Sequence, residues 1–343
     1  MTATNRASTP DSLSIPAGQH QIEAIRNEIL KRRRFLITSH SRPDGDSIGS
    51  QLAMAFALDA LGKQVRIVNS DLAPEHYQEF PGMDRIEIAE AIEAPDVDAV
   101  IVMECSDLRR TGVSGLDREF LINIDHHAGN ALYGAINWHD ETAAACGEMV
   151  FAIIQALGVT LSEEIATHVY LAILTDTGSF HHSNITPRTF DICRQCVEAG
   201  VTPAVMARRV FDSNSFGKLK LIGALLDDME LADEGRLAIL HLNDDMLAAT
   251  GSTHNDTEGL INLPLTAREI QAVVFFKVTN TGDVRVSMRS KYDVDVRRVA
   301  NEFGGGGHKN AAGFTVSGPL QDIRAGIVDR LVRAIESGLQ TRP

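Results

Sequence analysis

Short apolar runs alternate with helical patterns through the first half of the chain, and this alternation constrains the fold more than any other feature. The runs Phe35–Thr38, Val65–Val68, Ala99–Met103 and Leu121–Ile124 have the length of buried strands, and the segment 48–61 is the clearest of the helices between them. Strands that alternate with helices predict an α/β fold, a parallel sheet with helices on both faces. Ligands of such sheets bind outside the carboxyl ends of the strands.

The pattern changes in the second half of the chain. A mostly helical stretch, 187–230, is followed by three predicted strands at 236–240, 270–278 and 284–288. A length of 343 residues also favours two domains. We therefore predict four parts, the last of them a smaller α/β domain with a mixed sheet. They are a disordered tail (1–19), a first α/β domain (20–186), a helical linker (187–230) and a second α/β domain (231–343).

The charge balance limits the partners that such a chain can take. With 32 basic and 46 acidic residues the formal net charge is −14, which disfavours a protein that clamps long duplex DNA through its phosphates. An acidic protein can still bind phosphates through metal ions or a few local cations. No apolar run reaches the roughly 20 residues of a membrane span, and the four cysteines fit buried thiols better than a metal knuckle. We therefore expect a cytoplasmic protein.

Acidic and imidazole side chains follow three of the predicted strands where these strands end. They are His40, Asp44 and Asp46 after the first strand, Glu104 and Asp107 after the third, and Asp125, His126 and His127 after the fourth. A further carboxylate, Asp176, ends the helix predicted to begin at Ser162. Because the carboxyl ends of parallel strands lie at one edge of a sheet, all of these groups can meet there.

Each of these residues alone has a structural explanation, since Asp46 can cap a helix and Asp176 can end one. Together they need another, because several carboxylates buried at one edge cost several kcal/mol for each unpaired charge unless cations hold them. Many oxygen ligands with a few imidazoles suit Mn²⁺ or Mg²⁺, and five or six ligands suit two ions about 3.5–4 Å apart. Such a pair can hold a hydroxide and aim it at phosphorus.

Three motifs in the first half resemble the DHH phosphoesterase superfamily. They are His40-x-x-x-Asp44-x-Asp46, Asp125-His126-His127 and Thr175-Asp176-Thr177-Gly178. In the second half, Gly304-Gly-Gly-Gly-His308 followed by Ala311-Ala-Gly-Phe314 resembles the DHH-associated C-terminal domain. The likeness covers nearly everything after the N-terminal tail. The chain is most similar to the subfamily of oligoribonuclease (nanoRNase) and 3′-phosphoadenosine 5′-phosphate phosphatase enzymes.

The resemblance implies a catalytic first domain that binds two divalent cations, with Mn²⁺ favoured and Mg²⁺ as the alternative. The implied metal ligands are His40, Asp44, Asp46, His126 and Asp176, and the implied catalytic residues are His127, near the scissile phosphate, and Asp125. One position departs from the family, which usually has Asp as the bridging ligand after the third strand, where this chain has Glu104 and then Asp107. We favour Glu104 as the bridging ligand, and Asp107 stays open as the alternative.

The resemblance also implies that the second domain grips the substrate. Four consecutive glycines allow positive φ and close approach of a ligand to the backbone, while His308 adds hydrogen bonds. The implied substrate-binding residues are Arg289, Ser290, Gly306, Gly307 and His308, with a weaker case for Arg188 and His181.

Several functions are compatible with these motifs. The first is hydrolysis of short single-stranded RNA and dinucleotides from the 3′ end, together with the 3′-phosphate of phosphoadenosine phosphate. The related alternatives are a cyclic-dinucleotide phosphodiesterase, a manganese pyrophosphatase and a RecJ-like exonuclease. A non-catalytic nucleotide-binding module is the alternative from another class. The motifs leave a homodimer open and give no reason to expect a membrane partner.

Overall fold

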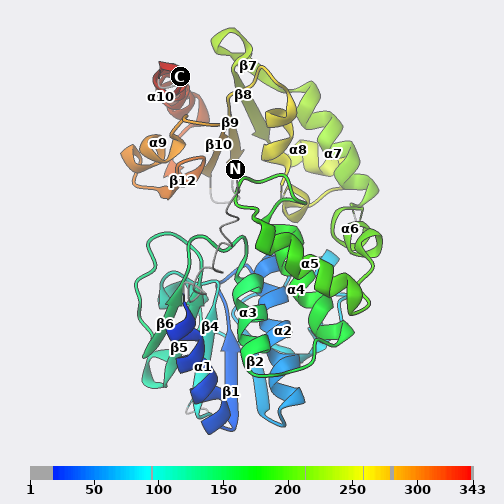
Figure 1. Ribbon diagram of the computed structural model, residues 1–343. Coiled ribbons are helices and arrows are strands. Elements are labelled where there is room, and N and C mark those ends of the chain that lie inside the picture. Colours follow the sequence, from blue (N-terminus) through cyan, green and yellow to red (C-terminus); the bar gives the residue numbers. More distant parts are fainter. Residues whose placement is uncertain (1–17, 94–95, 213, 258, 279–281, 341–343) are drawn as a thin grey trace, which may run out of the picture. The chain divides into compact units, whose positions relative to one another are not determined.

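The structure is a computed structural model that describes residues 18–93, 96–212, 214–257, 259–278 and 282–340 (Figure 1). The predicted tail, 1–19, lies outside these residues except at its end, where α1 (Gln19–Lys31) begins. Two compact units divide the chain, Met1–Ser213 and Asn214–Pro343. The division therefore falls inside the segment 187–230 that we predicted as a linker.

The first unit is built on a six-stranded parallel sheet, and this confirms the predicted fold class. In sheet order its strands are β3 (Ile86–Ile88), β2 (Gln64–Asn69), β1 (Arg34–Thr38), β4 (Ala99–Met103), β5 (Leu121–Asp125) and β6 (Ile136–His139). The register aligns Thr38 with Val102 and Met103 with Ile124. The carboxyl ends of β1, β4 and β5 therefore lie side by side at one edge.

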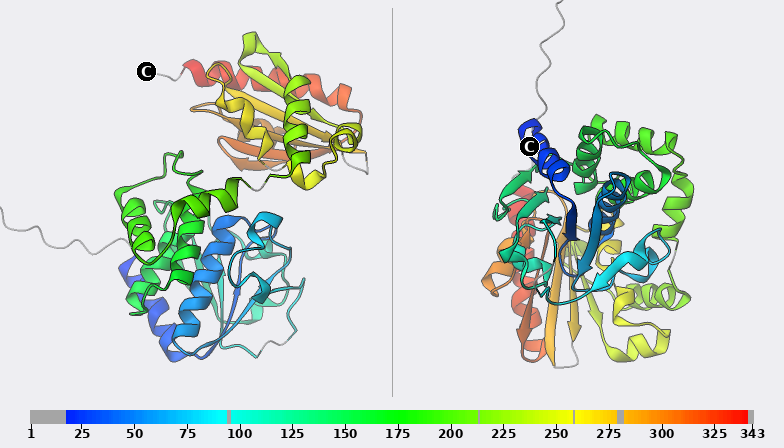
Figure 2. Two further views of the ribbon diagram at one scale, coloured as in Figure 1. Left: turned by 90° about the vertical axis from the view of Figure 1, so that its right-hand side faces the viewer. Right: turned by 90° about the horizontal axis from the view of Figure 1, so that it is seen from below.

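The two faces of this sheet are covered differently. Four α-helices of the main core lie on one face, the first three of them against the sheet and the fourth on the second and third helices, which can be followed in Figures 1 and 2. They are α1, α2 (Gly45–Ala60), α3 (Cys146–Ala156) and α4 (Glu163–Asp176). The other face buries a smaller core that includes Leu36 and Val100 of the sheet. It is covered by loops and by the one-turn 3-10 helices η3 (Leu108–Thr111) and η4 (Leu116–Arg118), and not by α-helices. The α/β class is confirmed, but the prediction of helices on both faces is wrong for this face, because the connection between β4 and β5 forms only these short helices.

Two glycines allow α2 and α4 to approach closely. A Cβ at Gly45 would lie 2.4 Å from the Thr175 side chain, and a Cβ at Gly49 would lie 2.5 Å from the carbonyl oxygen of His168. No larger residue fits at Gly49 unless the backbone of α4 moves. This packing brings the start of α2 against the end of α4, and so it brings the residues at these two helix ends together.

We predict that Gly49→Ala destabilises the protein by about 1–2 kcal/mol. The contact with backbone atoms costs about 1–3 kcal/mol, which exceeds the gain of up to about 1 kcal/mol from the higher helix propensity of alanine. Urea denaturation followed by circular dichroism measures the change. Gly223→Ala is the matched control, because a Cβ at this helical glycine meets nothing within 4 Å and alanine should stabilise the helix. Equal stability of the Gly49→Ala variant and the parent would contradict the close packing of α2 on α4.

The helices after α4 divide between the two units. α5 (Pro187–Glu198) and α6 (Pro203–Phe211) pack on the first unit through α4, whereas α7 (Phe216–Asp227) packs against α8 (Asp244–Thr250) in the second. The stretch 187–230 is thus mostly helical, as its pattern predicts.

The second unit has a six-stranded mixed sheet, as predicted. In sheet order its strands are β11 (Gly306–His308), β12 (Ala311–Ser317), β10 (Asp283–Ser290), β9 (Ala272–Val278), β8 (Leu237–Leu242) and β7 (Glu230–Ala232). Only β8 and β9 pair in parallel among these strands of the described residues. Figure 1 shows α9 (Val296–Glu302) and α10 (Leu320–Gln340) on one side of this sheet and α7 and α8 on the other.

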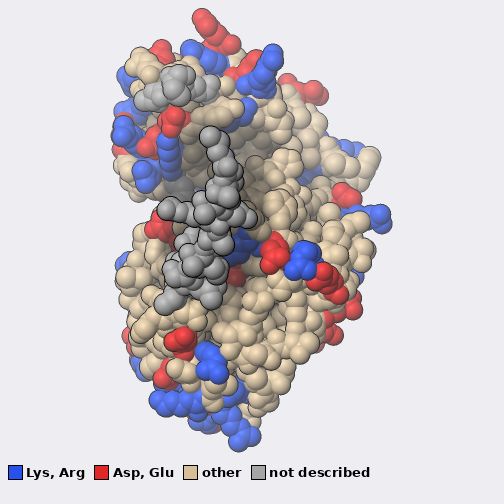
Figure 3. Space-filling model, in the orientation of Figure 1, with Lys and Arg blue, Asp and Glu red and all other residues tan. Residues whose placement is uncertain are grey.

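Charged side chains of both signs are mixed on one face of the molecule. On the face drawn in Figure 3, the lysines and arginines of the described residues lie in separate groups with acidic side chains among them. Among the described residues, no helix combines the length and the apolar character that a membrane crossing requires.

Candidate metal centre

The edge formed by the carboxyl ends of β1, β4 and β5 carries the predicted ligands. His40 follows β1, Glu104 follows β4, and the triplet 125–127 begins at the last residue of β5. Asp44 caps the N-terminus of α2 by accepting a hydrogen bond from the Ser47 backbone. Asp176 is the last residue of α4 and reaches the same place because α2 packs on α4.

Six of the predicted side chains form two adjoining groups of three. Within each group the potential ligand atoms lie within 4.8 Å of one another. One group is His40, Asp44 and Glu104, and the other is Asp46, His126 and Asp176. Glu104 also lies in a third group of this kind with His126 and His127, so it adjoins both groups. The Nε2 atom of His126 is 3.2 Å from Glu104 Oε1, 3.7 Å from Asp176 Oδ2 and 3.8 Å from Asp46 Oδ2.

Asp107 contacts neighbouring residues and not the ligand groups. It caps η3 by accepting a hydrogen bond from the Arg109 backbone, and it pairs with the Arg109 guanidinium at 2.6 Å. These contacts lower the pKa of Asp107 to about 2. The geometry therefore favours Glu104 over Asp107 as the shared ligand.

The hydrogen bonds of the two imidazoles determine which ring nitrogen faces the cluster. Nδ1 of His126 lies 3.0 Å from the carbonyl oxygen of Ala143, and Nδ1 of His40 lies 2.9 Å from that of Ser41. A carbonyl only accepts, so both Nδ1 atoms carry a proton, and Nε2 is the atom of each ring that faces the carboxylates. Burial lowers the pKa of His126, but the close contact with Glu104 and the charge of Glu104 raise it more, to about 11. Among the described residues, Glu104 Oε1 is buried and has no hydrogen-bond partner of acceptable geometry.

The buried carboxylates repel one another. Asp46 and Glu104 are each 1% exposed. Burial, together with the charges of Glu104 and Asp176, raises the pKa of Asp46 well above its ordinary value. Burial likewise raises the pKa of Asp176 to about 6. Divalent cations bind carboxylate oxygens and imidazole nitrogens that gather in this way, so the residues present fit a pair of such ions.

Backbone groups at the start of α3 hold two of these ligands in place. The amides of Cys146 and Gly147 donate to the two carboxylate oxygens of Asp46 at 2.7 and 3.0 Å, and Ala143 accepts from His126. The N-terminus of a helix favours a negative charge, which helps Asp46 to ionise in a buried position. Sequence inspection did not single out this support, because it depends on a contact between residues 100 positions apart.

Asp125 acts on His127 and is not part of the ligand groups. Its Oδ1 lies 2.8 Å from Nδ1 of His127, and its Oδ2 accepts a hydrogen bond from the side chain of Asn130 at 2.7 Å. Burial raises the pKa of Asp125, and the bonds from His127 and Asn130 lower it, with a net decrease. Asn130 was missed at the sequence level, where nothing distinguished it from other loop asparagines.

The two weaker substrate candidates belong to the first unit, and both contact other groups of the protein. His181 is exposed, and its Nδ1 contacts the carbonyl oxygens of Gly178 and Ser179. Arg188, in the first turn of α5, contacts Glu148 and Asp140. Neither lies in the groups of potential metal ligands.

The other substrate candidates lie in the second unit. Arg289 and Ser290 end β10, and the Ser290 hydroxyl donates to Val294 while accepting from Asn310. The glycine run is in part a strand, because Gly306 to His308 form β11. A Cβ at Gly305 would lie 2.3 Å from the carbonyl oxygen of Gly313, and a Cβ at Gly307 would lie 2.4 Å from that of Ala311, both in β12, so close strand pairing already requires glycine there.

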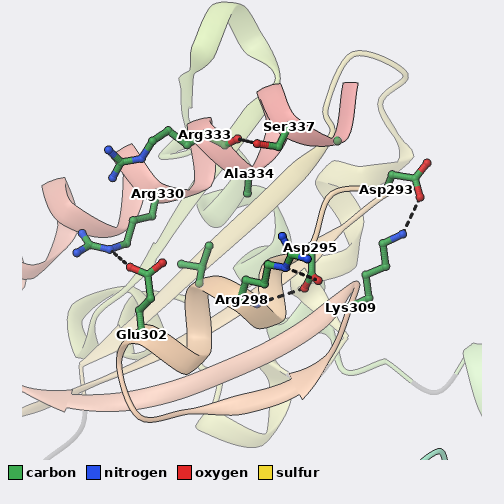
Figure 4. Close-up of a pocket in the computed structure, with 11 residues that line it drawn as sticks. Asp293, Asp295, Arg298, Glu302, Lys309, Arg330, Arg333, Ala334 and Ser337 are labelled. Atoms are coloured by element: carbon green, nitrogen blue, oxygen red, sulfur yellow. Dashed lines mark hydrogen bonds and ion pairs between the residues drawn. The ribbon is translucent and has the colours of Figure 1, made fainter. Parts of the chain in front are cut away.

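The second unit also has an open pocket of about 600 Å³ between α9 and α10 (Figure 4). Several of its charged side chains pair with each other, as Lys309 does with Asp293 and Arg330 with Glu302. Of the predicted substrate residues, none lines this pocket.

Comparison with known proteins supports the resemblance seen in the motifs. The family "DHH family, N-terminal domain" matches residues 34–173, and the "DHHA1 domain" matches residues 243–339. The bifunctional oligoribonuclease and PAP phosphatase NrnA of Thermus thermophilus is 33% identical over 296 residues, which are 85% of this chain and 87% of that protein. A probable manganese-dependent inorganic pyrophosphatase of Enterococcus faecalis is 22% identical over 46% of this chain and 53% of its own.

A solved structure shows the same fold. An exopolyphosphatase-related protein from Bacteroides fragilis has a TM-score of 0.85 at 23% identity, and the match covers 92% of this chain and 96% of that one. The predicted recognition and fold class are therefore confirmed. Because both domains match in order and a relative is similar over most of its length, this chain belongs to the DHH family.

Proposed function

We propose that this protein is a two-metal phosphoesterase that hydrolyses short oligonucleotides, including dinucleotides, from the 3′ end and removes the 3′-phosphate of 3′-phosphoadenosine 5′-phosphate. The observation that carries the proposal is the pair of three-ligand groups that adjoin at Glu104. The substrate class rests on the similarity to the Thermus enzyme.

The two groups would hold the ions. His40 and Asp44 would bind one, Asp46, His126 and Asp176 would bind the other, and Glu104 would bridge them. When bound, two divalent cations would offset the charge that develops on the phosphoryl oxygens and lower the pKa of an attacking water. We favour Mn²⁺, because the donor set of oxygens and imidazoles suits it and a relative's name states this metal.

His127 would contact the substrate phosphate, and Asp125 would orient His127. Because Nδ1 of His127 is held by Asp125, contact between this ring and a substrate falls to Nε2. In that position the imidazole would donate a hydrogen bond to a phosphoryl oxygen or a proton to the leaving oxygen. Asp125 would fix the ring and stabilise its charged form.

Arg289 is the strongest candidate for gripping the substrate. Among the described residues its guanidinium has no carboxylate partner, and it donates to the carbonyl oxygen of Met288. Burial lowers the pKa of Arg289, which means that the charge is held at a cost that an anionic ligand would offset. We propose that His308 and the backbone of Gly306 and Gly307 assist it, while Ser290 supports the turn through its two hydrogen bonds.

The test is an assay of the purified chain with Mn²⁺ against three substrates: a ribodinucleotide, phosphoadenosine phosphate and inorganic pyrophosphate. We expect release of mononucleotides from the dinucleotide and phosphate from phosphoadenosine phosphate, with both lost after removal of metal by a chelator. Hydrolysis of pyrophosphate alone would assign the chain to the pyrophosphatases, and no hydrolysis of any substrate would indicate a binding module. A 5′-labelled trinucleotide reports the polarity, since attack from the 3′ end leaves a labelled dinucleotide first.

A further inference from the structure

We propose that Arg188 is a positioning residue for the metal ligands Asp46 and His126, and does not bind substrate. This inference rests on the proposed function for its metal ions. It concerns a small network of side chains between the start of α5 and the segment 140–148, both in the first unit.

The guanidinium of Arg188 spans two carboxylates. Its Nε and Nη2 atoms each lie 2.8 Å from Oε2 of Glu148, and its Nη1 lies 3.6 Å from Oδ2 of Asp140. Glu148 is 1% exposed and Asp140 Oδ2 is buried, whereas the Arg188 side chain is 46% exposed and covers them from the solvent side. An arginine that is directed at two inward carboxylates is already committed to the protein, which argues against a role as a phosphate ligand.

A second contact joins the same two segments. The side-chain amide of Asn184, just before α5, donates to the carbonyl oxygen of Ala144 at 2.8 Å. Asn184 and Arg188 therefore hold the segment 140–148 at its start, its middle and its end.

That segment carries the supports of the metal cluster. Ala143 accepts from His126, and the amides of Cys146 and Gly147 donate to Asp46. Glu148 lies one residue beyond these amides, in the same first turn of α3. A displacement at Glu148 would therefore be transmitted to the two hydrogen bonds that orient Asp46.

Loss of Arg188 would leave a buried carboxylate without its cation. The Arg188 side chain is 46% exposed, but Glu148 is buried and carries its charge beneath it, so without the guanidinium the first turn of α3 is expected to shift toward water to hydrate Glu148. Groups that orient metal ligands typically contribute 10–100-fold to metal affinity. The position of Arg188 thus predicts an effect on metal binding, whereas a substrate ligand would change KM.

The experiment measures Mn²⁺ binding by titration calorimetry, well below the unfolding temperature of each variant. We expect Arg188→Met to weaken Mn²⁺ binding by about 10–100-fold, with activity recovered at high Mn²⁺ and the KM for a dinucleotide then within about threefold of the parent. The Mn²⁺ affinity of Arg188→Lys should lie between those of Arg188→Met and the parent. Hydrogen exchange of the Cys146 and Gly147 amides in the metal-free protein should be faster in Arg188→Met.

Two further variants sharpen the test. Arg188→Met combined with Glu148→Gln should bind Mn²⁺ more tightly than Arg188→Met alone, because no uncompensated charge remains at position 148. Arg194→Met is the matched control, since Arg194 lies on the same helix and, within the described part of the chain, its ion pairs are with the exposed Asp191 and Glu198. This variant should bind Mn²⁺ like the parent.

Unchanged Mn²⁺ affinity in Arg188→Met with a KM raised tenfold or more would overturn the proposal and make Arg188 a substrate ligand. Unchanged affinity with only a lower melting temperature would overturn it as well. If Arg188→Met does not fold, the proposal is overturned when Arg188→Lys and Glu148→Gln both bind Mn²⁺ as tightly as the parent. A parent protein that binds Mn²⁺ but hydrolyses none of the substrates would sink the proposed function while this test still applies.

Discussion

Glu104→Gln is expected to lower kcat by about 10³-fold or more, equivalent to about 4 kcal/mol of transition-state stabilisation. Glu104 is the one carboxylate that adjoins both ligand groups, so neutralising it weakens the hold on both ions at once. The amide nitrogen of glutamine would also place a donor where Nε2 of His126 lies 3.2 Å away. Steady-state kinetics with a dinucleotide, together with Mn²⁺ titration, measures the two consequences.

Asp107→Asn is the control for this prediction. Asp107 is the neighbouring carboxylate that the sequence left open, and in the structure it caps η3 and pairs with Arg109. Its replacement should leave kcat within about threefold and cost at most about 1 kcal/mol of stability through the weakened cap. If Asp107→Asn were as damaging as Glu104→Gln, the shared-ligand role of Glu104 would be wrong.

The shorter variant Glu104→Asp tests the size of the ligand. Glu104 has a positive φ of 56°, so the backbone after β4 turns in a conformation that is uncommon for residues other than glycine. That turn and the extra methylene together place the carboxylate between the two groups. We expect Glu104→Asp to retain more activity than Glu104→Gln but to bind Mn²⁺ more weakly than the parent.

The sequence was sufficient for four of the six strands of the first sheet, β1, β2, β4 and β5, and for the prediction that the acidic and imidazole side chains gather at one edge of it. Parallel strands end at one edge, so a carboxylate or imidazole directly after β1, β4 or β5 has few other places to lie. His40 and Glu104 follow this rule directly. The positions of Asp46 and Asp176 depend in addition on the close packing of α2 on α4, which Gly45 and Gly49 allow. The spacing of these glycines is compatible with such packing but does not predict it by itself.

The sequence was insufficient where a side chain is committed to a distant partner. Arg188 is 40 residues from Glu148, and no local pattern announces that the two meet. The same holds for Asp46 and the first turn of α3. The glycine run shows a different limit, because glycine serves close strand pairing and close ligand approach equally well, and only the neighbouring backbone at Gly313 and Ala311 separates these causes.

His127→Ala is expected to lower kcat by about 10²–10⁴-fold while leaving Mn²⁺ affinity within about tenfold, because this ring would act on the phosphate and is not needed to complete either ligand group. Asp125→Asn should lower kcat less, by about 10–100-fold, since it removes the charge that holds Nδ1 of His127 but leaves the ring in place. The double variant should have a kcat no lower than that of His127→Ala, because Asp125 acts through that ring.

His20→Ala, which removes an exposed imidazole of α1, is the control. Additive losses in the double variant, or a His127→Ala enzyme within threefold of the parent, would separate Asp125 from His127 and leave the proposed catalytic role of this pair without support.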